Sequence, residues 1–300
     1  MTEVAFVGMG GVASAVAAHL WQGGIQDMRL CSRRPFTALV VDEPRRRIRV
    51  PIAATLDPAN VEPAKWVFVG TKAQQTPGAA AWLSALCDSD SRVVVLQNGV
   101  EQRERLTPYV RGAAVIPAVV YCPAEMLSPG SVRVLGATSL TVADDEHGRA
   151  LQSLTQSSDM AINLSEDITR ALWGKLCVNA VVAPITALTG KPLGVFHVPE
   201  IESFAYALLE EVVAVAEAEG AHLTKEMVTH AVTRSQAAPR VQKPSTLQDR
   251  LAGRELEYDA LNGAVVRLGQ KHGIATPLNA AMVALMKATS ANVEAAEPSA

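Results

Sequence analysis

The stretch of sequence that decides the fold is VAFVGMGGVA, residues 4–13. Its first four residues form an apolar run typical of a buried strand, and an alanine-rich helical pattern follows the glycines. A strand, a glycine turn and a helix in this order are the context that a dinucleotide-binding fingerprint requires. The stretch therefore predicts the start of a parallel sheet, with a nucleotide site at its glycine turn.

Each small residue of the turn has its own expected role. Gly8 permits the tight turn, and Gly10 lets the backbone approach a pyrophosphate. Ala13 replaces the third glycine, whose role is close packing between helix and strand. The first amides of the helix then face the phosphates, and the helix dipole favours their negative charge. The residues expected to bind the dinucleotide here are Gly8, Gly10, Gly11, Val12 and Ala13.

The chain has 300 residues, 49% of them hydrophobic, and a formal net charge of −3. Its length indicates one large domain or two of ordinary size. The small net charge gives no electrostatic reason to expect nucleic acid or an anionic membrane as a partner. We find no uncharged apolar run of about 18 residues and expect no transmembrane helix. We interpret residues 4–7 as a core strand rather than a signal peptide, and the basic run at 45–49 as a solvated strand edge or turn.

The cysteines and histidines lack the spacing of a metal site. No two histidines have helical metal-ligand spacing, and the four cysteines are scattered at Cys31, Cys87, Cys122 and Cys177. We therefore expect reduced thiols in a cytoplasmic protein, and no metal.

The first half of the chain alternates apolar strands with helical patterns. This alternation predicts an α/β domain of Rossmann type over residues 1–166, with a parallel sheet and helices on both faces. The segments around Gly136 look like a closing hairpin. The expected strands are 3–7, 27–31, 66–69, 92–97, 113–120, 133–135 and 139–143, and the expected helices are 12–22, 76–86, 101–107 and 145–157.

The second half reads as almost wholly helical, which predicts a separate helical domain over residues 167–290. Gly220 and Gly273 stand where two of its helices are expected to end. Residues 291–300 are small and polar and are interpreted as a tail. The expected helical segments are 168–188, 201–219, 247–254, 258–272 and 277–289.

The end of the second predicted strand indicates which dinucleotide binds. An NAD site usually has an acidic residue there, which binds the ribose 2′-hydroxyl. The sequence here is Ser32-Arg33-Arg34, without an acid. Ser32 can hydrogen-bond a 2′-phosphate, and Arg33 or Arg34 can pair with it. We therefore expect NADP(H) rather than NAD(H).

Six segments, in this order, resemble the ketopantoate reductase (2-dehydropantoate 2-reductase) family over nearly the full length of the chain. The resemblance implies an NADP-dependent reduction of a 2-keto acid, above all 2-dehydropantoate to pantoate on the route to coenzyme A. It also implies a Rossmann domain and an all-helical C-terminal domain of the 6-phosphogluconate dehydrogenase type. The matching segments are the turn at Gly8, residues 71–72 (TK), 97–99 (QNG), 173–179 (WGKLCVN), 245–249 (STLQD) and 257–263 (EYDALNG).

Lys175 is the expected general acid. Hydride addition to a ketone builds negative charge on its oxygen, which requires a proton or a cation in the transition state. Lys175 lies in an otherwise apolar helical pattern, and Asn179 follows four residues later on the same helix face. The asparagine can orient the lysine or bind a substrate hydroxyl. The alternative for Lys175 is an amine that reaches from an apolar surface into solvent.

The family resemblance assigns four further residues. Glu257 is the acidic partner that binds substrate and helps to set the charge of the lysine, and Ser245 contacts the substrate carboxylate or caps a helix. Lys72 and Asn98 follow predicted strands, at the sheet edge where ligands bind. The resemblance places Lys72 near the nicotinamide and Asn98 near both the nicotinamide and the substrate.

One residue departs from the family pattern. The family commonly has a second substrate-facing asparagine four residues after Asn179, where this chain has Ala183. Loss of a matched polar contact can shift specificity strongly, so a less polar 2-keto acid or a different 2-keto-3-hydroxy compound remains open as the substrate. A β-hydroxyacid dehydrogenase and a non-catalytic NADP(H)-binding regulatory protein are the alternative functions. The sequence does not decide whether the chain forms a homodimer.

Overall fold

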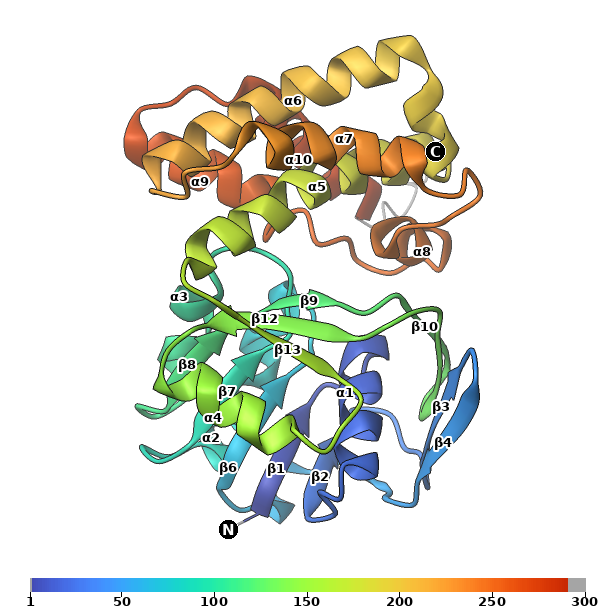
Figure 1. Ribbon diagram of the computed structural model, residues 1–300, viewed down its shortest axis with the longest axis vertical. Coiled ribbons are helices and arrows are strands. Elements are labelled where there is room, and N and C mark those ends of the chain that lie inside the picture. Colours follow the sequence, from blue (N-terminus) through green and yellow to red (C-terminus); the bar gives the residue numbers. More distant parts are fainter. Residues whose placement is uncertain (1, 291–300) are drawn as a thin grey trace, which may run out of the picture. The chain divides into compact units, whose positions relative to one another are not determined.

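The computed structural model describes residues 2–290, and the chain divides into two compact units between Ile168 and Thr169. The sequence predicted this boundary between residues 166 and 167. The predicted tail at 291–300 lies outside the described residues. Figure 1 labels the elements of both units.

The first unit is built on a six-stranded parallel sheet with the strand order β5-β2-β1-β6-β7-β8. In order along the chain these strands are the third, second, first, fourth, fifth and sixth of the sheet, which is the Rossmann order. The predicted fold is therefore confirmed, with the first strand in the middle of the sheet (Figure 1). The strands are β1 (Thr2–Val7), β2 (Met28–Cys31), β5 (Ala54–Thr55), β6 (Ala64–Val69), β7 (Arg92–Val95) and β8 (Ala114–Pro117).

Both faces of this sheet are covered. Successive side chains of β1 enter different apolar clusters, because side chains alternate across a strand. Phe6 packs on the face that holds α1, where its ring stacks on Phe68 at 5.0 Å, whereas Val7 packs on the face that holds α2. The helices are α1 (Gly11–Gln22), α2 (Ala80–Leu86), α3 (Gln102–Leu106) and α4 (Glu146–Thr155), with short 3-10 turns η1 (Pro58–Asn60), η2 (Ala73–Gln75), η3 (Pro77–Ala79) and η4 (Thr107–Tyr109).

Two smaller sheets complete the unit, and they correct the sequence analysis. The predicted strand 113–120 is two strands, β8 and β9, in different sheets. The hairpin expected around Gly136 is wrong, because β11 pairs with β10 and β3, whereas β12 pairs with β13 and β9. The sheets have the orders β10-β11-β3-β4 and β13-β12-β9, formed by β3 (Leu39–Glu43), β4 (Arg46–Val50), β9 (Val119–Tyr121), β10 (Ala124–Ser128), β11 (Ser131–Val134), β12 (Ser139–Ala143) and β13 (Ala161–Ser165).

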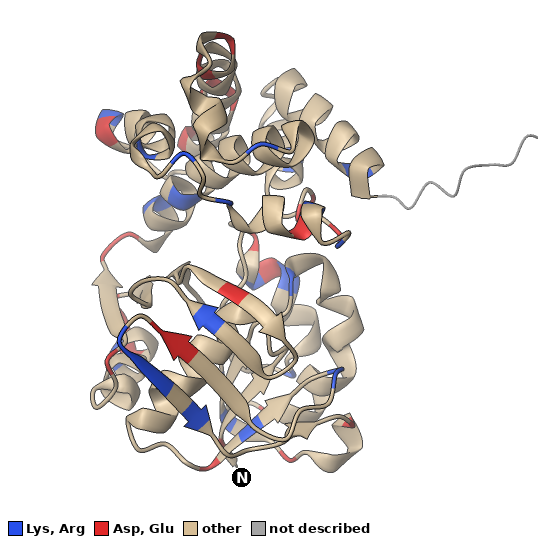
Figure 2. Cartoon of the chain, turned by 90° about the vertical axis from the view of Figure 1, so that its right-hand side faces the viewer, with Lys and Arg blue, Asp and Glu red and all other residues tan. Residues whose placement is uncertain are grey.

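The basic run at 45–49 lies at a solvated edge, as predicted. It runs from the turn before β4 into that strand, which is the last of its sheet, and Arg47 and Arg49 are exposed. Arg47 pairs with Asp42 of β3, and Arg133 of β11 pairs with Glu125 of β10. Figure 2 faces this side of the unit and shows basic and acidic residues together on its strands.

All regular elements among the described residues of the second unit, 169–290, are helices, as predicted. Helix α7 was not predicted. The helix predicted from residue 258 begins only at Asn262, because the residues before it form a turn in which the Gly263 amide donates to the Tyr258 carbonyl. Gly220 and Gly273 follow their helices with φ of 76° and 69°, a conformation that glycine adopts without strain. The elements are α5 (Ile168–Thr189), η5 (Leu193–His197), α6 (Pro199–Ala218), α7 (Lys225–Ala237), α8 (Ser245–Leu251), α9 (Asn262–His272) and α10 (Pro277–Ser290).

Helix α5 is the one helix among residues 2–290 that is long and apolar enough to cross a membrane, by length and composition alone. Of its most apolar window, 67% is buried inside the protein. Leu176, Cys177 and Val181 are among the residues that it contributes to the core. This burial is that of a core helix.

Candidate functional site

The glycine turn joins β1 to α1 through a backbone conformation that requires glycine. Gly8 has φ of +87°, and a Cβ there would lie 2.5 Å from Thr71 Cγ2. The Gly8 amide donates to the Cys31 carbonyl at 3.0 Å, and the Gly10 amide donates to the Gly8 carbonyl at 3.0 Å. These bonds hold the turn against the end of β2.

Ala13, at the third position of the glycine pattern, packs closely as expected. It is fully buried, and a Cβ on Gly70 would lie 2.4 Å from the Ala13 Cβ and 2.8 Å from the Gly8 carbonyl oxygen. The methyl group of Ala13 therefore occupies space that Gly70, directly after β6, leaves open. Sequence reasoning missed Gly70 because its partner lies far away along the chain.

The start of α1 fits a dinucleotide phosphate. No side chain caps the helix, and its first turn has no acidic residue. The first amides of a helix lack intrahelical partners and attract anions. A Cβ on Gly10 would meet only the Gly70 carbonyl oxygen, at 3.5 Å, so backbone and ligand can approach closely there. The residues that could hold a pyrophosphate are Gly10, Gly11, Val12 and Ala13.

Ser32, Arg33 and Arg34 follow β2 beside this turn. The Ser32 amide donates to the Thr55 carbonyl at 3.0 Å, and the Arg34 amide donates to Ser32 Oγ at 3.1 Å. The hydroxyl of Ser32 accepts this bond and retains its own proton to donate. Arg33 and Arg34 are exposed. An exposed guanidinium and a hydroxyl donor at this point suit a phosphate better than a neutral ribose hydroxyl.

Lys72 and Asn98 lie at the same edge of the sheet as the glycine turn. Lys72 follows β6 and precedes η2, and Asn98 follows β7. Because β1, β6 and β7 are neighbouring parallel strands, their carboxyl ends meet at one edge, where ligands bind in open α/β sheets. The structure thus brings the predicted cofactor residues of the first unit together.

A glutamine to which the sequence analysis gave no role connects the segments at this edge. Gln97 is buried, and its Nε2 donates to Thr71 Oγ1 at 3.0 Å and to Thr76 Oγ1 at 2.9 Å. The backbone carbonyl of Gln97 accepts from Gln102 Nε2 at 2.7 Å. Gln102 Nε2 also donates to the Ala118 carbonyl, and Gln102 Oε1 accepts from the Ala118 amide. This network fixes the backbone next to Lys72 and Asn98. Gln97 stands in the quoted segment 97–99, but that segment alone does not reveal the network, because its partners are ordinary polar residues elsewhere in the chain.

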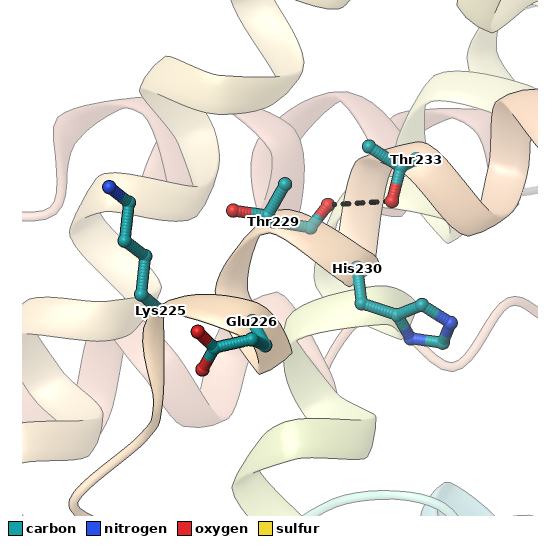
Figure 3. A pocket seen from close by; sticks show the side chains of 5 residues that line it. All are labelled: Lys225, Glu226, Thr229, His230 and Thr233. Atoms are coloured by element: carbon teal, nitrogen blue, oxygen red, sulfur yellow. Dashed lines mark hydrogen bonds between the residues drawn. The ribbon is translucent and has the colours of Figure 1, made fainter.

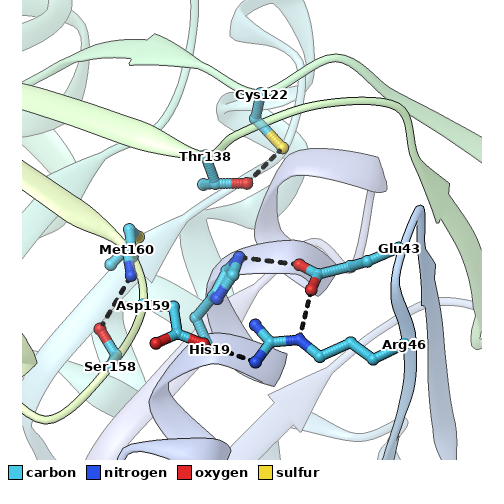
Figure 4. A network of polar contacts seen from close by, with 8 residues as sticks. All are labelled: His19, Glu43, Arg46, Cys122, Thr138, Ser158, Asp159 and Met160. Carbon is cyan, nitrogen blue, oxygen red and sulfur yellow. Dashed lines mark hydrogen bonds and ion pairs between the residues drawn. The ribbon is translucent and has the colours of Figure 1, made fainter.

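A charged network holds α1 from its other side (Figure 4). His19 of α1 is buried, and its Nε2 lies 3.1 Å from Glu43 Oε1. Glu43 Oε2 accepts from Arg46 Nε at 2.6 Å, and Arg46 also pairs with Asp159. Burial lowers the pKa of His19 below its ordinary value, an effect that the nearby carboxylates of Glu43 and Asp159 oppose.

In the second unit, Lys175 and Asn179 lie four residues apart on α5, and both are half-buried. They share one face of the helix. Gly174 precedes the lysine where α7 packs closely, because a Cβ there would lie 2.4 Å from Met227 Cε. A glycine within a helix costs about 1 kcal/mol relative to alanine, so this close approach explains its presence.

Glu257 and Ser245 come from other segments of the second unit. Glu257 lies between α8 and α9 and is 2% exposed, which is rare for a carboxylate and indicates a paired group. Ser245 is exposed and is the first residue of α8. Its alternative role as a helix cap is wrong, because Pro244, with an extended backbone, occupies the N-cap position.

A shallow hollow of about 470 Å³ lies along α7 and contains none of the predicted site residues. Figure 3 shows that its side chains come from one helix, where Thr233 Oγ1 donates to the Thr229 carbonyl at 3.1 Å. The hollow is lined by Lys225, Glu226, Thr229, His230 and Thr233. We assign no function to it.

Three of the four thiols are too deeply buried to react as thiolates. Burial raises the pKa of Cys31, Cys87 and Cys177 to about 12, so they remain protonated at neutral pH. Cys122 is half-buried and accepts from Thr138 Oγ1. Within residues 2–290, no group of three or more His, Cys, Asp or Glu side chains is arranged to hold a metal ion.

Comparison with known proteins matches both units to one family. Residues 4–146 match the model of ketopantoate reductase PanE/ApbA, and residues 167–290 match the model of the ketopantoate reductase PanE/ApbA C terminal. The 2-dehydropantoate 2-reductase of Caulobacter vibrioides is 35% identical over 288 residues, 96% of this chain and 99% of that protein. The 2-dehydropantoate 2-reductase of Mycobacterium tuberculosis is 36% identical over 294 residues, 96% of this chain and 98% of that protein.

Solved structures of ketopantoate reductases also match this chain. A ketopantoate reductase of the PanE/ApbA family from Ralstonia eutropha JMP134 has a TM-score of 0.88 and 31% identity, covering 96% of this chain and 98% of that one. A dimeric ketopantoate reductase from Staphylococcus aureus has a TM-score of 0.86 and 25% identity over the same shares. The fold and these matches define an NAD(P)-dependent oxidoreductase. The chain belongs to the ketopantoate reductase family.

Proposed function

We propose that this protein reduces 2-dehydropantoate to pantoate with NADPH in the cytoplasm, a step of pantothenate biosynthesis on the route to coenzyme A. The observation that carries the proposal is the pair Lys175 and Asn179. Between Arg170 and Thr186, these are the only charged or amide side chains of α5, and they share its half-buried face. Family membership gives this pair a reaction, because an ammonium group in such a place suits a developing alkoxide.

Lys175 acts as the general acid. When bound, the reduced nicotinamide supplies a hydride to the keto carbon, and the carbonyl oxygen then gains negative charge. Lys175 Nζ donates a hydrogen bond to this oxygen and transfers a proton to it, which completes the hydroxyl of the product. Lys175 recovers a proton from solvent. The Asn179 amide holds the lysine or a substrate hydroxyl.

The other proposed residues bind and orient. Glu257 accepts a hydrogen bond from the substrate and favours the charged form of Lys175, because a nearby carboxylate stabilises an ammonium group. Ser245 donates its hydroxyl proton to the substrate carboxylate. Asn98 orients the keto acid and the nicotinamide, and Lys72 binds the cofactor near the nicotinamide. These roles follow the family resemblance.

NADPH is the proposed cofactor. Ser32 and Arg33 lie beside the turn that would hold the pyrophosphate, and no acid follows β2 there to repel a 2′-phosphate. Arg33 is exposed and therefore accessible to the ligand. A guanidinium pairs with a phosphate through two parallel hydrogen bonds.

The position of Ala183 makes the substrate a question for experiment. Ala183 is 4% exposed and follows Asn179 by four residues on α5. Its methyl group cannot bind a substrate hydroxyl. The test measures NADPH oxidation with 2-dehydropantoate, with branched 2-keto acids that lack its hydroxyl, and with NADP⁺ plus a 3-hydroxy acid in the reverse direction.

We expect the highest kcat/KM with 2-dehydropantoate. A preference of about tenfold or more for a hydroxyl-free 2-keto acid would reassign the substrate, in line with the size of effect that one matched polar contact has. Turnover of the 3-hydroxy acid alone would favour the β-hydroxyacid dehydrogenase alternative. Tight NADPH binding without turnover of any substrate would favour a regulatory protein.

We also propose that the chain forms a homodimer, which the dimeric relative from Staphylococcus aureus supports. Light scattering coupled to size-exclusion chromatography measures the mass directly. A mass of one chain, 31.7 kDa, at micromolar concentration would contradict the proposal.

A further inference from the structure

A proline inside α5 leaves one backbone carbonyl without its helical partner. Pro184 has no amide proton, so the carbonyl of Ala180, four residues earlier, receives no bond from it. Asn262 of α9 supplies the missing donor, because its Nδ2 lies 2.8 Å from the Ala180 oxygen. The side chain of one helix thus completes the hydrogen bonding of another.

The same amide begins a chain of buried hydrogen bonds. Asn262 Nδ2 also donates to Asn279 Oδ1 at 2.9 Å, and Asn279 Nδ2 donates to Glu211 Oε2 at 2.8 Å. Both asparagines are completely buried. Glu211 of α6 accepts the amides of Leu278 and Asn279 at the start of α10, at 2.8 and 2.9 Å. The network therefore joins α5, α9, α10 and α6.

The direction of each amide is fixed. The Ala180 carbonyl accepts hydrogen bonds and cannot donate one, so Asn262 must present its NH2 group. The Glu211 carboxylate is an acceptor when ionised, so Asn279 must present its NH2 group in turn, and its oxygen faces Asn262. Position 262 therefore requires a side chain whose NH2 group donates to both acceptors, as that of asparagine does.

The two ends of the Asn262 amide differ in their hydrogen bonding. Its Oδ1 is buried and has no hydrogen-bond partner. An apolar side chain at this position would instead leave two buried acceptors, the Ala180 carbonyl and Asn279 Oδ1, without this donor, and an unsatisfied buried acceptor costs about 1–3 kcal/mol. The NH2 group, which donates to both acceptors, is therefore the part of the side chain that the network requires.

The network contacts α5 next to the proposed catalytic residues. Ala180 directly follows Asn179 and lies about 7.5 Å along the helix axis from Lys175, at 1.5 Å per residue. Asn262 also ends the turn that begins at Glu257, where the Leu261 amide donates to the Glu257 carbonyl at 3.3 Å. One side chain therefore links the segment of Glu257 to the helix of Lys175.

We propose that Asn262 is a positioning residue, which holds the face of α5 that bears Lys175 and Asn179 in register with the segment that bears Glu257. The inference rests on the proposed function for its link to catalysis. Pro184 makes the link necessary, because it removes the bond that would otherwise stabilise α5 at this point.

Asn279→Ala is the matched control for Asn262→Ala. Both variants remove a buried asparagine of one network, but only Asn262→Ala breaks the bond to the Ala180 carbonyl. We expect Asn262→Ala to lower kcat by about tenfold or more, since small displacements of catalytic groups are costly, and to change KM for NADPH by less than about twofold. Asn279→Ala should lower the melting temperature to a similar extent but lower kcat by less than about threefold.

A rescue experiment isolates the single bond. Pro184→Ala returns an amide proton at position 184, which can bond the Ala180 carbonyl. In this background, Asn262→Ala should lower kcat by less than about threefold, since the carbonyl again has a donor. Asn262→Ser, which leaves a smaller void and cannot reach Ala180, replaces Asn262→Ala if that variant does not fold.

Hydrogen exchange gives a readout that does not depend on activity. Without cofactor, Asn262→Ala should increase amide exchange in residues 180–185 of α5 more than Asn279→Ala does, and Pro184→Ala should suppress the increase. Equal effects of the two asparagine variants on both kcat and exchange would overturn the inference. An inactive wild-type enzyme that still shows the exchange difference would instead refute the proposed function and leave the link between helices intact.

Discussion

Gly70 lies against Ala13 so closely that no side chain fits between them, with only 2.4 Å from a Cβ built on Gly70 to the Ala13 methyl carbon. The backbone after β6 therefore packs directly against the Ala13 methyl group in the first turn of α1. This contact sets the height of the glycine turn above the sheet, and with it the position of the helix amides that would hold a pyrophosphate.

Gly70→Ala should accordingly weaken both the fold and cofactor binding. The new methyl group must displace Ala13 or the Gly8 carbonyl, and overpacking of this kind costs about 1–3 kcal/mol in unfolding free energy. We expect a rise in the dissociation constant of NADPH, measured by fluorescence titration. Gly78→Ala is the control, because a Cβ there meets nothing within 4 Å. Equal behaviour of the two variants would show that the close contact is unimportant.

Arg33→Ala should change the choice between cofactors. A charge-assisted hydrogen bond is worth about 1.5–3 kcal/mol, and solvent around this exposed arginine reduces the effect to the lower end, about tenfold in KM for NADPH. The KM for NADH should change by less than about twofold, because NADH lacks the 2′-phosphate. Arg49→Ala serves as the control, because Arg49 is also an exposed arginine but lies on β4, away from the end of β2. A parallel rise of both Michaelis constants after Arg33→Ala would argue against contact with the phosphate.

His19 should make the folded state sensitive to acid. Its pKa in the folded state lies below the ordinary value of 6.5, chiefly because of burial, so below pH 6.5 the unfolded chain takes up a proton that the folded chain does not. The free energy of unfolding therefore falls as pH decreases from about 6.5 to the lower folded pKa, and above this window His19 contributes no slope. Glu43 and Asp159 raise the pKa of His19 and Arg46 lowers it, but burial is the largest cause of the shift.

Denaturant unfolding between pH 5 and 8 measures this effect. His19→Gln should flatten the dependence on pH, whereas His230→Gln, at an exposed position on α7, should leave it unchanged. An identical slope in wild type and His19→Gln would mean that other groups cause the acid sensitivity.

The elements that could be predicted from the sequence are those with a local signal. The turn at Gly8, the parallel strands β1 and β2 and the apolar helix α5 each have a pattern within a few residues of sequence. The pairing of β11 with β3 could not be predicted, because it depends on side chains that lie about 90 residues apart. Helix α7 was missed because only Ala231, Val232 and Ser235 of its residues are buried, and these small side chains leave a weak apolar stripe.

The residues of the candidate site also differ in whether the sequence could identify their roles. Lys175 and Asn179 could be identified from their spacing and from the family resemblance, which also indicated Glu257. Gln97 and Asn262 lie within the quoted motifs, yet their bonds to Thr71 and Ala180 join distant segments. Such supporting contacts become visible only when the folded backbone brings the partners together.

The most direct test of the central claim is single-turnover reduction of 2-dehydropantoate by Lys175→Ala, with NADPH binding titrated on the same preparation. The account predicts a hydride-transfer rate at least about a hundredfold lower, within the range for loss of a general acid. The dissociation constant of NADPH should stay within about twofold of the wild-type value, since the cofactor residues of the first unit are unchanged. A variant that transfers hydride at a near-normal rate would contradict the role of Lys175 as the proton donor.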